Sequence, residues 1–137
     1  RNASLSQLVS APVRWIVEDA ARFVHRECKR GNSYDLIVID PPSYGHGPQG
    51  QTWNLQRDLP AFLSQCAHLL SPQPLGVVFT CHSPGYTPQV LRQAMLEAQL
   101  TCKNAEWELG PLLLTTPDGR TLHAGNSARW SVPSASL

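Results

Sequence analysis

Polar side chains that could do chemistry follow three apolar runs of the sequence, at residues 18–20, 40–44 and 80–83. Together they supply carboxylates, a tyrosine, a thiol and an imidazole. If the three runs are parallel strands of an open sheet, their carboxyl ends lie on one side, where such sheets place their ligands. The pattern therefore predicts one cleft in which charged and nucleophilic groups converge.

The most informative of these groups is Asp40, which Pro41 and Pro42 follow directly. The four branched apolar residues before it, 36–39, indicate a strand that is buried on both faces. Two prolines cannot extend a hydrogen-bonded ladder, so they form a rigid wall beside a single negative charge. We expect this arrangement to hold a small polar group next to a cofactor.

The elements that must position these groups alternate along the chain. Apolar runs, helical periodicity and turn residues predict strands over 13–17, 34–39 and 76–80, helices over 20–30, 55–70 and 90–98, a glycine-rich loop over 43–54, and β segments over 104–109, 112–116 and 127–132. This alternation predicts one α/β domain over residues 1–137. Its sheet is doubly wound and mainly parallel, with an antiparallel hairpin at the C-terminal end.

Composition excludes some classes of function. The formal net charge is +1, so no strong electrostatic footprint demands a nucleic acid. No apolar run reaches the ~18 residues that span a bilayer, and no signal peptide is visible. We therefore expect a cytoplasmic protein without a membrane partner. The spacing of the cysteines fits neither a zinc site nor a disulfide scaffold, so we expect reduced thiols and no metal at Cys28, Cys66, Cys81 and Cys102.

The motif Asp40-Pro41-Pro42-Ser43-Tyr44 after a buried strand resembles the fourth motif of the class I S-adenosylmethionine-dependent methyltransferases. The resemblance implies a Rossmann-like sheet, S-adenosylmethionine as cofactor, and a methyl-transfer site lined by Asp40, Pro41 and Pro42. It also places Asp19 and Ala20 where members of the family contact the adenine amino group. Asp19 could equally cap the helix that follows it.

Within that superfamily the motif looks most like the large-subunit ribosomal RNA methyltransferases that modify carbon 5 of cytosine, which implies an RNA substrate. Carbon 5 becomes nucleophilic only after a thiolate has added to carbon 6. Cys81 follows a strand where those enzymes carry such a cysteine, so Asp40 and Cys81 are the candidate catalytic residues. The alternative is that Cys81 is a small buried apolar residue.

Methyl transfer to an exocyclic amine is the competing chemistry. Enzymes of that kind usually carry an aromatic residue directly after the prolines, where it stacks on a flipped base. Here Ser43 intervenes and Tyr44 comes one residue later. Tyr44 and His46 could still stack on a base and are the candidate substrate-binding residues. Trp53 could join them or fasten the loop to the core.

The resemblance also implies that parts of the fold are missing. The glycine-rich cofactor loop and the acidic residue that binds the ribose do not occur before Asp40. Residues 1–8 would then be the end of a helix, and two absent strands would separate 13–17 from 34–39 in the family's order 3-2-1-4-5-7-6. We expect 13–17 to stand apart and this chain to bind S-adenosylmethionine weakly. A non-catalytic RNA-binding or assembly module and a Rossmann-type dehydrogenase fragment are the alternatives.

Overall fold

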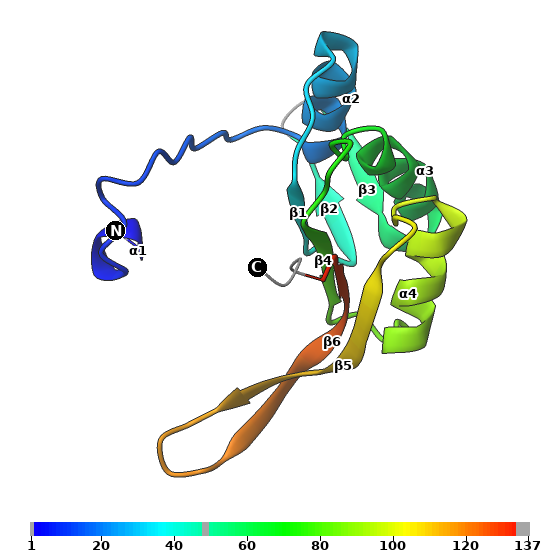
Figure 1. Cartoon of the computed structure of the whole chain (residues 1–137). Helices are drawn as coiled ribbons and strands as arrows, with labels where there is room; N and C mark the ends of the chain where they lie inside the picture. The colour runs from blue at the N-terminus through cyan, green and yellow to red at the C-terminus, as the bar shows by residue number, and fades with distance from the viewer. Residues whose placement is uncertain (1, 48–49, 134–137) are drawn as a thin grey trace.

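The computed structural model describes residues 2–47 and 50–133 (Figure 1). Its main sheet has four strands in the order β1-β4-β6-β5. β1 (Leu36–Ile39) and β4 (Gly76–Cys81) are parallel, whereas β6 (Thr121–Ser131) is antiparallel to β4 and to β5 (Glu106–Thr115). This order matches the expected 4-5-7-6, and the antiparallel hairpin β5–β6 extends well beyond the body (Figure 1).

Three helices pack against one face of this sheet, and each begins at a polar side chain that caps it. They are α2 (Ala20–Arg30), α3 (Leu55–Ala67) and α4 (Pro88–Glu97), capped by Asp19, Asn54 and Thr87. Each capping oxygen accepts a hydrogen bond from a backbone N–H of the first helical turn, which would otherwise lack a partner. Gly31 ends α2 in the left-handed conformation, with φ of 70°.

The expected loop over 43–54 contains a small hairpin instead. β2 (Tyr44–His46) and β3 (Thr52–Asn54) pair antiparallel, and Gly45 lies opposite Trp53. The indole of Trp53 packs edge-on against Phe62 of α3, with ring centroids 5.8 Å apart. Trp53 therefore fastens this segment to the core, which is one of the two roles expected for it.

The two faces of the main sheet have different surroundings. Side chains on the helix-covered face form the core, including Val77, Phe79 and Cys81 of β4, none of them more than 1% exposed. The opposite face carries Leu36 and Val38 of β1, which are 54% and 66% exposed. The expectation that β1 is buried on both faces is therefore wrong, because no helix among the described residues covers the second face.

The apolar run 13–17 forms no strand, although its composition predicts one. Residues 12–17 run in an extended path away from the body, and Trp15 is 75% exposed (Figure 1). A β-rich run becomes a strand only when a neighbouring strand satisfies its backbone groups, and no described strand lies beside it. The expectation that this segment stands apart is confirmed. The short helix α1 (Asn2–Leu5) precedes it.

Candidate functional site

The candidate site lies where β1 and β4 end, and its centre is a hydrogen bond between Asp40 and Thr80. The register pairs Ile39 with Phe79, so the next residues of the two strands are neighbours. The Thr80 hydroxyl donates to Oδ1 of Asp40 over 2.7 Å. Both side chains point to the uncovered face, because side chains alternate along a strand and Phe79 points into the core.

Two further hydrogen bonds hold the segment that follows Asp40. The indole N–H of Trp53 donates to the carbonyl oxygen of Pro42 over 2.8 Å. The hydroxyls of Ser43 and Ser83 share a hydrogen bond of 2.5 Å, which ties the segment after β1 to the segment after β4. Pro41 is buried, and Ser83 is only 7% exposed. The segment is therefore fixed on both sides of its prolines.

Two aromatic rings extend from this segment into solvent. Tyr44 and His46 lie on β2, and their rings meet edge to face with centroids 4.9 Å apart. Both residues are exposed. Arg57 anchors the other strand of the hairpin by donating to the carbonyl of Thr52 over 2.7 Å. The chain therefore presents two exposed aromatic rings, perpendicular to each other, within six residues of Asp40.

Cys81 lies next to Thr80 in the chain but on the other face of the sheet. Its side chain is 1% exposed and belongs to the hydrophobic core with Phe79 and Ala128. On β4 it pairs with Asn126 of β6. The structure therefore brings Asp40 and Thr80 together and places the thiol behind them, away from the uncovered face.

Asp19 caps α2, as one of its two expected roles requires. Its Oδ1 accepts a hydrogen bond from the backbone N–H of Arg22 over 2.9 Å. Ala20 is exposed at the first residue of the helix. α2 packs on α3, and the structure gives no hydrogen bond from Asp19 to the Asp40 segment among the described residues.

Thr80 and Ser83 support the site through hydrogen bonds that the sequence did not predict, whereas Trp53 supports it in one of the two roles expected for it. Each contributes through one hydrogen bond to a residue 11 to 40 positions away. The sequence could indicate only that Thr80 and Ser83 lie at the carboxyl end of a predicted strand. Which partner each would meet depends on the register between β1 and β4.

A buried carboxylate with a strongly lowered pKa lies outside this site. Glu27 of α2 is 5% exposed and accepts hydrogen bonds from Tyr34, Asn32 and Arg30, at 2.6, 2.6 and 2.9 Å. These donors lower the pKa of Glu27 to about 2. The same hydrogen bond raises the pKa of Tyr34. This cluster joins the end of α2 to the segment before β1 and has a structural role.

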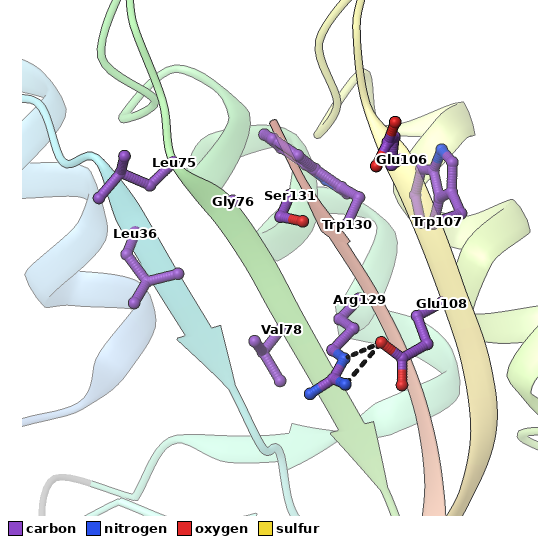
Figure 2. Close-up of a pocket in the computed structure, with 10 residues that line it drawn as sticks. All are labelled: Leu36, Leu75, Gly76, Val78, Glu106, Trp107, Glu108, Arg129, Trp130 and Ser131. Atoms are coloured by element: carbon purple, nitrogen blue, oxygen red, sulfur yellow. Dashed lines mark hydrogen bonds and ion pairs between the residues drawn. The ribbon is translucent and has the colours of Figure 1, made fainter. Parts of the chain in front are cut away.

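An open hollow of about 470 Å³ lies on the uncovered face (Figure 2). Leu36, Leu75 and Val78 line its apolar side, and an ion pair between Arg129 and Glu108 lines the other. Leu36 and Gly76 begin their strands, so the hollow lies at the end of the sheet opposite Asp40. It is therefore separate from the candidate site.

Two features are absent from the described residues, 2–47 and 50–133. These residues contain no helix that is both long and apolar enough to cross a membrane. They also contain no group of three His, Cys, Asp or Glu side chains arranged to hold a metal ion.

The strand order β1-β4-β6-β5 and the Asp40 carboxylate that follows β1 point to one class of protein fold. The chain has the α/β fold of solved S-adenosylmethionine-dependent methyltransferases. No protein-family model matches the sequence. The relationship is visible instead in individual proteins.

Among solved structures, a SAM-dependent methyltransferase from Agrobacterium tumefaciens superposes with a TM-score of 0.81 at 36% sequence identity, over 95% of this chain and 43% of that one. SMU.776, a putative methyltransferase complexed with SAH, superposes with a TM-score of 0.67 over 95% of this chain and 34% of that one. At 15% identity the second comparison supports the fold alone.

Two curated relatives bear the name ribosomal RNA large subunit methyltransferase K/L. The protein from Hahella chejuensis (strain KCTC 2396) is 31% identical over 83 residues, which is 60% of this chain and 11% of the relative. The protein from Pseudoalteromonas atlantica (strain T6c / ATCC BAA-1087) is 35% identical over 72 residues, 52% of this chain and 10% of the relative. This chain thus spans about a tenth of the length of the curated relatives it matches.

Proposed function

We propose that this protein is an S-adenosylmethionine-dependent methyltransferase that acts on RNA, with its methyl-transfer site at Asp40, Pro41 and Pro42. The observation that carries the proposal is the exposed Asp40 carboxylate at the carboxyl end of β1, beside a fixed proline wall. Open α/β sheets bind their ligands at this end. The similar protein from Agrobacterium tumefaciens is described as a SAM-dependent methyltransferase.

The residues present suit the cofactor at two points. Asp40 offers a carboxylate oxygen beside a rigid wall, and Asp19 uses only Oδ1 in capping α2, which leaves Oδ2 for an adenine amino group. Capping and cofactor contact are therefore compatible. S-adenosylmethionine, when bound, supplies the methyl group as an electrophile. The protein's own residues hold and orient the acceptor, and positioning of this kind supplies most of the catalysis.

RNA as the substrate rests on two observations. Both curated relatives are named as ribosomal RNA methyltransferases. Tyr44 and His46 follow Asp40 closely in the chain, and their exposed rings lie on a hairpin that Trp53 fixes to the core. Aromatic rings of this kind stack on unpaired bases. In this proposal the two rings hold the target base while Asp40 faces its reactive edge.

The acceptor atom divides the proposal into two versions. Methylation of cytosine carbon 5 requires the Cys81 thiolate to reach the base, and Cys81 is 1% exposed on the covered face. Transfer to an amine nitrogen requires an acceptor for the N–H group, and the exposed Asp40 carboxylate meets that requirement. The geometry therefore favours the amine version, and the cytosine version remains a prediction that rests on Cys81.

Nucleoside analysis of ribosomal RNA separates these versions. In a strain that lacks the gene, one methylated nucleoside should disappear, and the wild-type gene should restore it. We expect Asp40→Ala to reduce restoration by about 100-fold or more, and Cys81→Ala to leave it within a few-fold. Val38→Ala, on the same strand and face, serves as the matched control.

Three outcomes would change the proposal. Loss of 5-methylcytosine together with an inactive Cys81→Ala variant would establish the cytosine version. Unchanged nucleosides in all cellular RNA would remove the RNA substrate. Full restoration by Asp40→Ala would remove Asp40 from the site.

A further inference from the structure

We propose that Thr80 is a positioning residue for methyl transfer and acts by fixing the carboxylate of Asp40. The inference rests on the proposed function and extends it to a residue to which that function assigned no role. The Thr80 hydroxyl donates to Oδ1 of Asp40 over 2.7 Å. In the described part of the structure Oδ2 has no hydrogen-bond partner, so one oxygen is held and the other is left for the acceptor.

Thr80 is well placed to impose an orientation on its partner. It lies on β4, which pairs with β1 on one side and with β6 on the other. Its neighbours Phe79 and Cys81 are both buried in the core, so the backbone beneath the hydroxyl is anchored. A threonine side chain is also stiff about χ1, because its β-carbon carries two heavy atoms.

Asp40 lacks such support of its own. It follows the last residue of β1, its side chain is exposed, and only its backbone is restrained, by the proline that comes next. An exposed aspartate samples several rotamers. The hydrogen bond from Thr80 selects one of them and aims Oδ2 at the uncovered face. Misplacement of a catalytic group by about 1 Å can cost about 100-fold in rate, so a single donor can matter greatly.

The test compares three full-length proteins, the wild type, Thr80→Val and Thr80→Ser, as purified enzymes. The methyl acceptor is total ribosomal RNA from a strain that lacks the gene, and the donor is radiolabelled S-adenosylmethionine. Valine has nearly the same shape and a high strand propensity, so the fold should be kept, and thermal unfolding checks this. We expect Thr80→Val to lower kcat about tenfold or more while KM for S-adenosylmethionine changes less than about twofold.

Rescue by the conservative variant distinguishes positioning from packing. Thr80→Ser keeps the donor and should retain kcat to within about threefold. In an Asp40→Ala background, Thr80→Val should cost much less than it does beside Asp40, because the carboxylate it positions is gone. Wild-type kcat in Thr80→Val, or equal losses in the serine and valine variants, would overturn the proposal.

Crystal structures of the wild-type and Thr80→Val proteins test the same inference without activity. The Asp40 carboxylate should turn or become disordered in the variant, and an unchanged orientation would overturn the positioning role. If the wild-type protein methylates no RNA, the proposed function fails on its own. The two structures still decide whether Thr80 orients Asp40.

Discussion

The two faces of the main sheet differ in what covers them, and the difference assigns roles to adjacent residues. On β4, Val77, Phe79 and Cys81 face the helices and are buried, whereas Val78 and Thr80 face the uncovered side. The covered face supplies packing energy. The uncovered face presents the carboxylate and its donor. A thiol and a hydroxyl that are neighbours in the chain therefore have different surroundings.

The largest expected difference is in the reactivity of buried and half-buried cysteine thiols. Cys66 is buried in α3, and burial raises its pKa to about 12, from an ordinary value of 9.0. At pH 8 this reduces its thiolate fraction about a thousandfold. We expect Cys66 and Cys81 to resist a thiol reagent in the native protein, while the half-buried Cys102 reacts. Mass spectrometry after brief labelling identifies the modified sites.

Labelling of Cys81 also tests whether its thiol could take part in methyl transfer to cytosine. If Cys81 reacts as fast as Cys102 under native conditions, the core opens at the end of β4 and the cytosine version of the proposal gains support. Labelling in denaturant provides the control, since all four cysteines should then react alike.

A matched pair of valines tests the packing difference directly. Val77 is 0% exposed and Val78 is half-buried, on adjacent positions of the same strand. Val77→Ala should lower the free energy of unfolding by about 2–3 kcal/mol, since it removes buried methyl groups and leaves a cavity. Val78→Ala should cost less than about 1 kcal/mol. Urea unfolding measures both. Equal losses would show that the second face is covered in the protein tested.

The buried carboxylate of Glu27 in α2 should have a smaller, pH-dependent effect on stability. Its donors hold the pKa of Glu27 at about 2, below its ordinary 4.5, so the ionised group stabilises the fold above about pH 4.5. That contribution is lost as the pH falls through this range toward 2. Glu27→Gln should lower Tm at pH 7 and reduce the decrease of Tm between pH 4.5 and 2. Melting curves by circular dichroism follow both.

A hairpin carboxylate provides the control for this acid dependence. Asp118 at the tip of β5–β6 also has a lowered pKa, through Thr116 and Arg120, but it is exposed. Asp118→Asn should therefore change Tm little. An equally large change there would mean that acid sensitivity does not depend on burial.

Local features of the chain were predictable from sequence because they depend on near neighbours. The cap at Asp19, the left-handed Gly31 and the periodic helix over 55–67 involve residues within a few positions of one another. The strand order followed from the resemblance to methyltransferases rather than from composition. The small hairpin β2–β3 was missed because its pairing depends on Trp53 reaching Pro42 and Phe62.

The sequence by itself determined which residues could do chemistry, the alternation of helices and strands, and the rule that Thr80 and Cys81 point to opposite faces. Only the tertiary structure decided which of those faces the helices cover. Alternation along a strand is a local property of the backbone, whereas coverage depends on how distant elements pack. Asp40 and Thr80 therefore meet on the open side, and Cys81 lies in the core, because α3 and α4 pack behind the sheet.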